Sequence, residues 1–471
     1  MSQNLIAAIE IGSQQVSAVV GRKEPDGAIN VIAAEQEPSA KFIQRGRVFN
    51  PDLMSQCVKG MIGKLEATSH KAINKVYVGV GGIGLHTVLN KVVRNFAETT
   101  KVTQDIVDSI LDENRSCKIP DFSIIDVQTL EYKLQTQSLA DPVGVMSNRI
   151  EGNFLNIIVP SVSLEQLDIS FQAAKLPIAE TIVSPIQLAN TILTDAEKLS
   201  GCGFIDMGAQ STTIGIFEGK LLRYLAVLPL GGDNVTRDLM TVLSIEQQEA
   251  EDIKRRHGAA FIEAVESSPV AHDDIRLQDG RSVPYDKVVD IIESRMAEIL
   301  LNVAHIIKVE AGYTPDRLIG GLVVTGGASN MSAVDKALIE YTHIRKLRFV
   351  KNAPLTIRRS KPSNFNIDGT FNGVLSIVAN ATEECCSDER QNPDIFSEPQ
   401  QPTPEELEQQ RLEQERQEQE RLEKERQEQE RLKQEEKERR RNRFGSLKRV
   451  LKNGLDNLGK VFTEPSDDEE D

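Results

Sequence analysis

Three glycine-marked turns, each at the end of an apolar run, constrain the fold of this chain more than any other feature. They are residues 9–13 (IEIGS), 205–212 (IDMGAQST) and 324–328 (VTGGA). In the first two, a carboxylate precedes a tight turn that can aim backbone N–H groups at a phosphate chain, while the carboxylate holds a hydrated Mg²⁺. In the third, paired glycines let the backbone approach a flat base. Any one of these turns is ordinary, so the ordered set carries the argument.

The order and spacing of these turns resemble those of the actin, sugar-kinase and DnaK-type ATPase superfamily. Within it, residues 230–239 (LGGDNVTRDL) followed by 250–258 (AEDIKRRHG) are similar to the FtsA family of bacterial cell-division proteins, as are residues 141–145 (DPVGV) with 149–151 (RIE). The resemblance covers roughly residues 1–385. It implies an α/β fold of two actin-like lobes with ribonuclease H-like cores, an FtsA-type inserted subdomain, and a C-terminal tail that is helical or disordered.

The resemblance and the shifts in composition together predict the domain boundaries. The first-lobe core is expected at 1–83, 163–200 and 361–386, the inserted subdomain at 84–162, the second-lobe core at 201–232 and 316–360, and its helical subdomain at 233–315. The tail is expected to contain a Pro-rich linker (387–404), a charged Glu/Gln/Arg repeat spacer (405–441), an amphipathic helix (442–464) and an acidic end (465–471).

Local patterns predict several elements inside these domains. Strands are expected at 5–9, 17–20, 29–33, 76–80 and 322–325, and helices at 51–67, 162–175 and 184–199. In the insert, a helix should begin at Thr103, because a threonine followed by Gln104 and Asp105 is typical of a helix N-cap. A helix in the 284–311 stretch should bury one face, since Ile291, Met296, Leu300, Val303 and Ile307 recur at helical spacing.

The resemblance also implies a site for ATP and Mg²⁺. Glu10 and Asp206 would hold Mg²⁺ through water, and Glu251 and Lys254 would hydrogen-bond the ribose, although by themselves they could be an exposed ion pair. The expected ATP-binding residues are Glu10, Gly12, Ser13, Gln14, Asp206, Gly208, Ala209, Gln210, Ser211, Thr212, Gly231, Gly232, Glu251, Lys254, Gly326, Gly327 and Ala328.

Departures from the superfamily pattern leave the catalytic residues unassigned. Ser184 with Pro185 lies where related ATPases often present Glu-Pro, and Gln210 replaces a glycine of the phosphate loop. Hydrolysis needs an oriented water as well as bound Mg-ATP. Gln187 or Gln210 could supply the orienting group. We therefore expect an ATP-binding protein with weak or absent ATPase activity.

Composition is consistent with a cytoplasmic protein that contains more than one core. The chain has 471 residues, of which 39% are hydrophobic, so two lobes of ordinary size can form. The first residues lack the pattern of an export signal, and five cysteines without metal-ligand spacing indicate reduced thiols. No apolar run approaches the length of a membrane-spanning helix, so any membrane attachment should be peripheral.

The charge of −16 is unevenly distributed along the tail. Acidic residues dominate 405–438 and the last five positions, whereas 439–460 holds eight Lys or Arg against one acid. A ten-residue repeat that begins at Arg411 is made of good helix formers, but its leucines recur every ten residues and cannot form a heptad seam. A single exposed helix and a solvated, partly disordered spacer both fit this pattern.

The basic block is predicted to form a membrane-binding amphipathic helix. Its apolar residues share one narrow face and its basic residues lie beside or opposite it, which is typical of an interfacial helix on anionic lipid. A helix that docks on a protein partner is the alternative. Binding to nucleic acid is disfavoured, because the basic block has no Tyr or Trp on which bases could stack. The expected membrane-binding residues are Phe444, Leu447, Lys448, Arg449, Leu451, Lys452, Leu455, Leu458 and Phe462.

Together, the motifs and the resemblance predict a peripheral protein of the cytoplasmic membrane face at the division site. The resemblance implies self-association into actin-like filaments, anchoring of the tubulin-like protein FtsZ, and contacts with other division proteins. FtsZ would dock on the helical subdomain. The alternative is a soluble ATPase of the chaperone or sugar-kinase kind whose C-terminal helix binds a protein partner.

Overall fold

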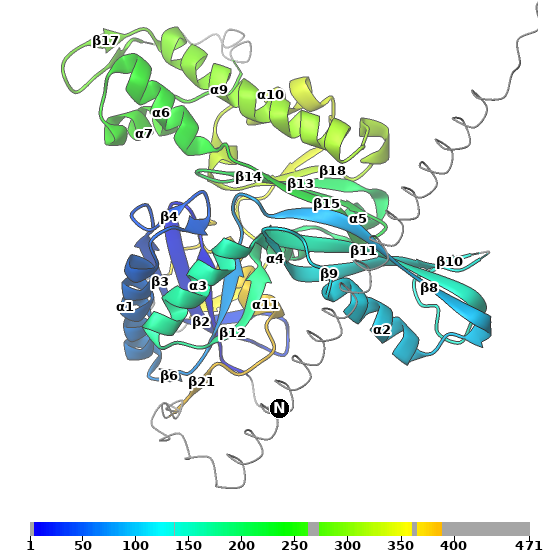
Figure 1. Cartoon of the computed structure of the whole chain (residues 1–471). Coiled ribbons are helices and arrows are strands. Elements are labelled where there is room, and N and C mark those ends of the chain that lie inside the picture. The colour runs from blue at the N-terminus through cyan, green and yellow to red at the C-terminus, as the bar shows by residue number, and fades with distance from the viewer. Residues whose placement is uncertain (1–3, 136, 262–272, 360–364, 389–471) are drawn as a thin grey trace, which may run out of the picture. The chain divides into compact units, whose positions relative to one another are not determined.

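The computed structural model describes residues 4–135, 137–261, 273–359 and 365–388 (Figure 1). The chain divides into two units, Met1–Gln391 and Asn392–Asp471. The predicted charged spacer, amphipathic helix and acidic tail lie outside the described residues, as does almost all of the Pro-rich linker. Those predictions therefore stay predictions.

The first-lobe sheet has the strand order β12-β7-β1-β2-β3-β20. β1 is apolar at every position except Glu10; it runs antiparallel to β2 and parallel to β7. Two-residue strands form small ribbons beside the sheet. The bounds are β1 (Ile6–Ile11), β2 (Gln15–Lys23), β3 (Ile29–Pro38), β4 (Ile43–Gln44), β5 (Arg47–Val48), β6 (Ala72–Ile73), β7 (Val76–Val80), β12 (Ile178–Val183), β20 (Ile357–Arg359) and β21 (Cys386–Ser387).

Helices cover both faces of the first-lobe sheet. On one face, α1 (Pro51–Ser69) packs against β3 and against α3 (Ser161–Ala174). It begins where Asn50 accepts a hydrogen bond from the Leu53 N–H, with proline in the first turn, as expected for a helix start. On the other face, α11 (Asn372–Asn380) contacts β1, β2 and β7. Burial of apolar side chains between these layers forms the first core.

The second-lobe sheet repeats this plan and continues into the insert. Its order is β10-β9-β11-β8-β15-β14-β13-β18-β19. Here β15-β14-β13 are antiparallel and β18 and β19 then run parallel, just as β3-β2-β1 are antiparallel and β7 and β12 parallel. The second-lobe strands are β13 (Cys202–Met207), β14 (Thr212–Glu218), β15 (Leu221–Leu228), β18 (Gly321–Thr325) and β19 (Leu347–Phe349).

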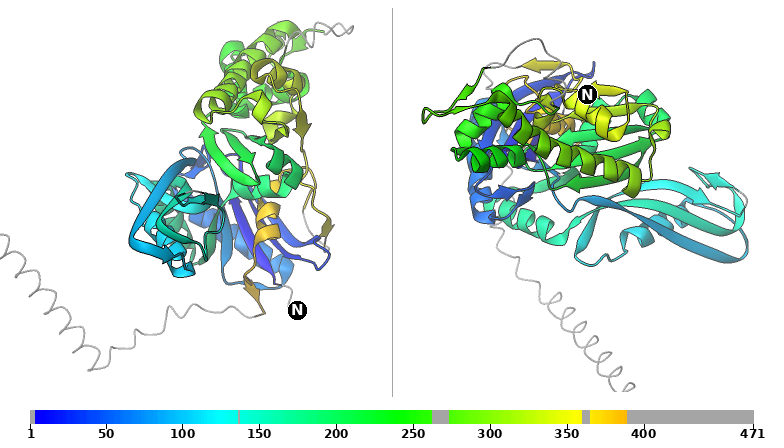
Figure 2. Two further views of the ribbon diagram at one scale, coloured as in Figure 1. Left: turned by 90° about the vertical axis from the view of Figure 1, so that its right-hand side faces the viewer. Right: turned by 90° about the horizontal axis from the view of Figure 1, so that it is seen from above.

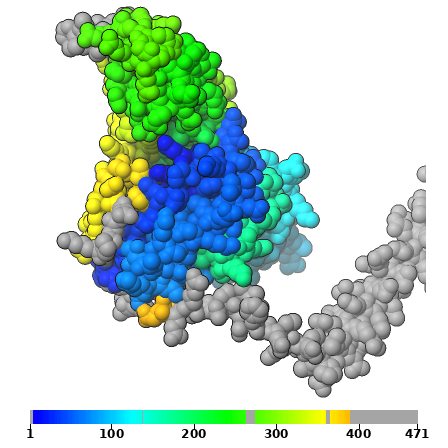
Figure 3. Space-filling view, turned by 90° about the vertical axis from the view of Figure 1, so that its left-hand side faces the viewer, coloured from blue at the N-terminus to red at the C-terminus, as the bar shows by residue number. Residues whose placement is uncertain are grey.

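A helical layer lies against one face of the second-lobe sheet, and Figure 3 shows this green block above the blue first lobe. In α9, the predicted face is confirmed, because Met296, Leu300 and Val303 are buried. The layer contains α6 (Gly232–Leu243), α7 (Gln247–His257), α9 (Tyr285–His305), the π-turn η1 (Ile306–Glu310), the 3₁₀ turns η2 (Pro315–Arg317) and η3 (Gly327–Asn330), and α10 (Val334–Thr342), with the ribbon β16 (Ile275–Arg276) and β17 (Ser282–Val283) beside it.

The insert projects from the side of the second-lobe sheet (Figure 2). His86 at the start of β8 pairs with Ala226 of β15, which joins the two parts of the sheet. α2 begins at the predicted cap, since the Thr103 side chain accepts a hydrogen bond from the Ile106 N–H. The insert consists of β8 (His86–Lys101), α2 (Gln104–Arg115), β9 (Phe122–Lys133), β10 (Ser138–Leu139) and β11 (Met146–Pro160).

The expectation of one helix at 184–199 is wrong. The structure has α4 (Ser184–Ile192) and a short α5 (Asp195–Ser200) instead. Thr194 and Glu197 form a capping box, in which each side chain accepts a hydrogen bond from the other residue's N–H. That local arrangement starts a new helix where one continuous helix was expected. α4 packs against α11 and also contacts β12 of the first lobe and β14 of the second.

Candidate functional site

The structure brings the two candidate metal-binding carboxylates together. Glu10 lies near the end of β1 and Asp206 near the end of β13, at matching places in the two sheets. Burial raises the pKa of Glu10 to about 7, and the negative charge of Asp206 adds to this, although the Ser184 hydroxyl opposes it by donating to Glu10 Oε1 at 2.6 Å. Burial also raises the pKa of Asp206 to about 6.

These carboxylates suit a divalent cation that brings further ligands with it. Two nearby buried carboxylates disfavour their own ionisation, and a cation between them would relieve that penalty. Among the described residues, no group of three or more His, Cys, Asp or Glu side chains could hold a metal. Mg²⁺ is commonly bound through one or two carboxylates together with waters and phosphate oxygens. The donor set here fits that mode.

The two hairpin turns that follow these carboxylates close in the same way. The Gly12 N–H donates to the Gln15 carbonyl at 3.1 Å, and the Gly208 N–H donates to the Ser211 carbonyl at 2.9 Å. In the first turn, Ser13 is partly exposed and Gln14 exposed; in the second, Ala209, Gln210 and Ser211 are partly exposed. The tips therefore lie at the surface of the sheets, where a ligand could reach them.

Ser39 braces the first turn, and the sequence reasoning missed it. Its N–H donates to the Gln14 carbonyl at 3.1 Å and its hydroxyl donates to the Gly12 carbonyl at 2.8 Å. Ser39 is fully buried directly after β3. The only signal in the sequence is a small polar residue after Pro38, and that is common in loops.

The third glycine turn lies against Asp206. Gly326 has φ 92°, and a Cβ at this position would come within 2.5 Å of Asp206 Oδ1 and 2.4 Å of the Met207 carbonyl oxygen. Only glycine satisfies both the backbone conformation and this contact. Gly327 differs, since a Cβ there would meet no atom within 4 Å. The turn is therefore closely packed against Asp206 at Gly326, and it has open space beside Gly327.

Gly231 and Gly232 support the second turn rather than presenting free donors. The Gly232 N–H donates to the Gly208 carbonyl at 3.0 Å, and the Gly231 N–H donates to Asn234 Oδ1 at 3.0 Å. Both glycines are expected ATP-binding residues, and in this structure their N–H groups are engaged within the protein, as are those of Gly12 and Gly208. Gly231 is needed for close packing, because a Cβ would lie 2.6 Å from the Ala209 carbonyl oxygen.

Thr212, another expected ATP-binding residue, has its hydroxyl engaged within the protein. It is fully buried at the start of β14, and its hydroxyl donates to the Leu230 carbonyl at 2.9 Å. The register that pairs Thr212 with Met207 and Leu228 places it inside the sheet. Its side chain therefore braces the chain before α6.

Glu251 and Lys254 form a largely buried pair beside the third turn. Their side chains are 20% and 12% exposed and lie 2.6 Å apart, which excludes a simple solvated ion pair. Lys254 Nζ donates to the Gly232 carbonyl at 3.1 Å. A Cβ on Gly232 would lie 3.5 Å from both Lys254 Nζ and the Cβ of Ala328. The helical pair and the third turn thus meet at Gly232.

Glu251 is also tied to its neighbours by hydrogen bonds. Burial tends to raise the pKa of Glu251, but hydrogen bonds from Lys254 and Thr236 together hold it below its usual value. Thr236 Oγ1 donates to Glu251 Oε2 at 2.7 Å and Arg255 Nε donates to Oε1 at 2.8 Å. The carboxylate is ionised at neutral pH and can accept further hydrogen bonds from hydroxyl groups.

The two groups considered for orienting water have different surroundings. Gln187 on α4 is partly exposed. Gln210 has both ends of its amide engaged, because Oε1 accepts from the Arg45 N–H at 2.7 Å and Nε2 donates to Asp233 Oδ2 at 3.1 Å. Ser184 directs its hydroxyl to Glu10. Both Gln210 and Ser184 are therefore already held by other protein groups in this arrangement.

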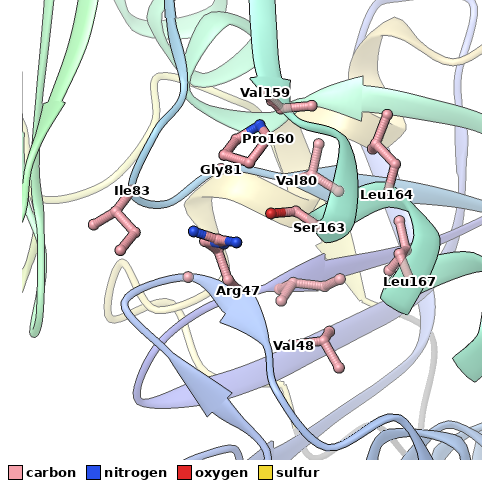
Figure 4. A pocket seen from close by; sticks show the side chains of 12 residues that line it. Arg47, Val48, Val80, Gly81, Ile83, Val159, Pro160, Ser163, Leu164 and Leu167 are labelled. Atoms are coloured by element: carbon pink, nitrogen blue, oxygen red, sulfur yellow. The ribbon is translucent and has the colours of Figure 1, made fainter. Parts of the chain in front are cut away.

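A separate cavity beside the first lobe is too small for a nucleotide. It has a volume of about 20 Å³ and is lined by Arg47, Gly81, Ser163 and apolar side chains (Figure 4). The Ser163 hydroxyl oxygen is buried and has no hydrogen-bond partner among the described residues. A cavity of this size holds about one water. It therefore suits a bridging water and does not compete with the carboxylate site.

No helix within the described ranges has the length and apolar character needed to cross a membrane.

Comparison with known proteins agrees with this architecture. The family model "Cell division protein FtsA" matches residues 204–369, and the model "SHS2 domain inserted in FTSA" matches residues 82–158, which contain most of the insert. Together the two models cover about half of the chain.

Curated relatives and a solved structure extend the comparison. The chain is 27% identical over 350 residues to the cell division protein FtsA of Porphyromonas gingivalis, with 72% of each chain covered. It is 25% identical over 340 residues to that of Escherichia coli K12, covering 70% of this chain and 80% of the relative. A chain of a PilM-PilN type IV pilus biogenesis complex shares the fold, with a TM-score of 0.55 and 14% identity over 79% of this chain and 97% of that one. The chain, with its two actin-like lobes and inserted subdomain, therefore belongs to the FtsA family of cell-division proteins.

Proposed function

We propose that this chain binds ATP with Mg²⁺ between its two lobes. The observation that carries the proposal is the pair of nearby carboxylates, Glu10 and Asp206, at the ends of two equivalent strands and beside two equivalent turns. Mg²⁺ would neutralise this pair and the phosphates together. The turns at Gly12 and Gly208 would face the phosphates, and the surface between Gly327 and Lys254 would receive the adenosine.

Turnover at this site should be slow or absent. A general base or water-orienting group must lie within hydrogen-bond distance of the attacking water. In this chain the Ser184 hydroxyl is bound to Glu10 and the Gln210 amide is bound at both ends. A phosphate-release rate of about 1 per second or more, which is in the usual range for enzymes, would contradict this part of the proposal.

Calorimetry tests the nucleotide site directly. Wild-type protein is titrated with ATP in the presence and absence of Mg²⁺, beside Asp206→Asn and a control, Asp168→Asn, that removes an exposed carboxylate on α3. Asp206→Asn should lower the affinity for Mg-ATP by about 100-fold, since a buried charge partner is lost. The control should bind like wild type. Absence of binding to the wild-type protein would overturn the proposal.

We extend the proposal to the membrane, on the evidence of the sequence alone. The C-terminal amphipathic helix would lie in the inner face of the membrane, and the charged spacer would set its distance from the folded core. Membership of the FtsA family supports a role in which the protein forms filaments, anchors FtsZ through its helical subdomain and contacts other division proteins. Docking of the helix on a protein partner is the competing explanation.

Vesicle co-sedimentation separates these explanations. Leu451→Glu and Phe462→Glu put a charge on the apolar face, whereas Asn453→Glu adds the same charge on the opposite face of the projected helix. The first two changes should release the full-length protein from anionic vesicles, because a buried charge opposes interfacial insertion. The Asn453 variant should lose less binding. If wild-type protein stays in solution with such vesicles, the helix binds a protein instead.

The same vesicles test the connection to FtsZ. Purified FtsZ should sediment with anionic vesicles only when the full-length wild-type protein is present. The Leu451→Glu variant should bind FtsZ in solution but fail to carry it to the vesicles. Sedimentation of FtsZ with vesicles in the absence of this protein, or no binding in solution, would contradict the anchoring role.

A further inference from the structure

The Gln210 side chain connects three segments that are far apart in the sequence. At the tip of the second turn, its carbonyl oxygen accepts the Arg45 N–H at 2.7 Å, and its amide nitrogen donates to Asp233 Oδ2 at 3.1 Å. Arg45 lies in the turn between β4 and β5 of the first lobe, and Asp233 lies in the first turn of α6 in the second lobe. One side chain therefore spans the boundary between the lobes.

The first-lobe end of this connection is fixed. Arg45 and Gly46 adopt φ values of 51° and 75°, and the Arg45 carbonyl accepts the Ile83 N–H at 3.0 Å. A Cβ on Gly46 would lie 2.5 Å from the Cα of Gly82, so the two turns are in close contact. Figure 4 shows Arg47, the first residue of β5 after this turn, beside Gly81 and Ile83. The Arg45 N–H is thus a donor held in place by the strand β7 that precedes these glycines.

The second-lobe end is fixed as well. The Asp233 N–H donates to the Ala209 carbonyl at 2.7 Å, so the start of α6 and the tip of the turn hold each other. α6 buries Val235 and Leu239 in the second-lobe core. Any movement of Gln210 relative to Arg45 is therefore a movement of one lobe relative to the other.

Chain connectivity does not enforce this contact. Some contacts of the site region join residues that are close in sequence. Asn372 at the start of α11, for example, accepts from the Ala353 N–H and donates to the Lys351 carbonyl, only about twenty residues away. The Arg45–Gln210 hydrogen bond joins residues 165 positions apart. The lobes also share a buried apolar cluster that includes Ile186 of α4 and Phe204 of β13, so this hydrogen bond is a reversible contact in addition to that packing.

We propose that Gln210 is an interlobe latch, which holds the lobes together through Arg45 and Asp233 and so slows nucleotide release. The chemistry requires an amide, because this position must accept from a backbone N–H and donate to a carboxylate at once. Alanine can do neither, and glutamate would place a second carboxylate against Asp233. The closure of the lobes follows from the structure alone, whereas the effect on nucleotide release rests on the proposed function.

Substitutions at Gln210 and Asp233 test the latch, because the second substitution should restore the contact that the first one breaks. Gln210→Glu should open it, and Asp233→Asn alone should keep it, because asparagine can still accept from the Gln210 amide. The double variant Gln210→Glu with Asp233→Asn should close it again, since the asparagine amide now donates to the new carboxylate. Gln210→Ala serves as a second opening variant that introduces no charge.

Distances between spin labels measure the opening without any nucleotide. Labels are attached to full-length protein at Lys59→Cys on α1 and Asp290→Cys on α9, two exposed positions, after Cys57 and Cys117 are changed to serine. Gln210→Ala and Gln210→Glu should broaden the distance distribution toward longer values. The wild-type, Asp233→Asn and double-variant distributions should coincide. Identical distributions for all variants would overturn the latch, even if ATP binds normally.

Release of a fluorescent ATP analogue and its ADP counterpart measures the functional effect. One hydrogen bond of ordinary net strength corresponds to about fivefold, so Gln210→Ala should speed release of both nucleotides by about that factor. Gln210→Glu should speed it by tenfold or more, and Asp233→Asn in the double variant should restore it. If only the triphosphate were released faster, Gln210 would be a phosphate ligand and the latch would be wrong. If neither analogue bound the wild-type protein, the proposed function would fail, and the label distances would still decide the latch.

Discussion

In the first lobe, the carboxylate at the strand end accepts a hydrogen bond from a side chain, whereas in the second lobe it lies against a backbone turn. Glu10 accepts a hydrogen bond from Ser184, and Gly373 leaves it space, since a Cβ there would overlap the Glu10 carboxylate. Asp206 lies against Gly326, and burial raises its pKa; among the described residues no side chain is found to donate to it.

This difference shows that two turns with the same strand arrangement can hold carboxylates with different neighbours. The strand order and turn closure are the same in both lobes. Glu10 already has a hydroxyl that partly compensates its charge, and Asp206 has no such donor among the described residues, yet burial raises the pKa of both well above the usual range. Asp206 differs in lying against the left-handed backbone of Gly326. We therefore expect backbone changes around Asp206 to affect stability more than the matching changes around Glu10.

The largest effect should come from the glycines beside the two carboxylates. Gly326→Ala forces a side chain into a backbone of φ 92° and into contact with the Met207 carbonyl, so it should lower the free energy of unfolding by about 4 kcal/mol. Gly373→Ala has no positive φ to accommodate, and the three atoms nearest its Cβ all belong to the Glu10 side chain, so it should cost less, about 1–2 kcal/mol. Denaturant unfolding of both variants checks the ranking, and a larger loss for Gly373→Ala would contradict the comparison.

Titration of Glu10 should make the stability of the ligand-free protein depend on pH. Because the pKa of Glu10 is raised to about 7, the folded state binds this proton more tightly than the unfolded chain. The resulting penalty is absent below about pH 4.5 and reaches its full size above pH 7. Glu10→Gln should therefore raise the free energy of unfolding at pH 8, by about 3 kcal/mol at most, and by little at pH 4.5.

Thermal unfolding without nucleotide, measured at both pH values, checks this dependence. Asp206→Asn provides the matched comparison, since burial raises the pKa of Asp206 to about 6 and its gain should level off at a lower pH. A stabilisation by Glu10→Gln that stays the same at pH 4.5 and pH 8 would show that its charge is not the cause.

The turns were predictable from the sequence because their signals are local. A glycine after an apolar strand, a threonine cap and a helical spacing of apolar residues each act within a few positions, and the turn at Gly12, the cap at Thr103 and the buried face of α9 follow from them. The break between α4 and α5 was also local, since Thr194 and Glu197 have capping-box spacing, but apolar periodicity across it hid the signal.

The partners of the site residues were not predictable in the same way. Ser184 and Glu10 are 174 residues apart, so their hydrogen bond depends on how α4 packs beside β1. Thr212 looked like part of a phosphate turn, but strand register placed it inside the sheet. A motif gives the residue types at a turn. The topology decides which of their polar groups remain available.

A smaller effect should come from the two hydroxyl groups that brace the turns. Ser39 donates to the Gly12 carbonyl in the first lobe, and Thr212 donates to the Leu230 carbonyl in the second. Ser39→Ala and Thr212→Val should each lower the free energy of unfolding by about 1 kcal/mol, because one buried hydrogen bond is lost. Chemical denaturation measures both. A loss above about 3 kcal/mol in either variant would mean that the hydroxyl does more than brace its turn.

The smallest effect on stability should come from Gly327→Ala, which tests where the base lies. A Cβ at this position would meet no atom within 4 Å, and the residue does not have positive φ, so the ligand-free protein should keep its stability or gain about 0.5 kcal/mol. If the adenosine packs on this open side of the third turn, the added methyl group will occupy part of its place. Affinity for ATP should then fall by about tenfold, while inorganic triphosphate, which lacks the base, should bind equally to both proteins. Gly60→Ala is a control, since its Cβ would also meet open space but lies on α1. Unchanged ATP affinity in Gly327→Ala would place the adenosine elsewhere and leave only the two carboxylate turns as the shared part of the site.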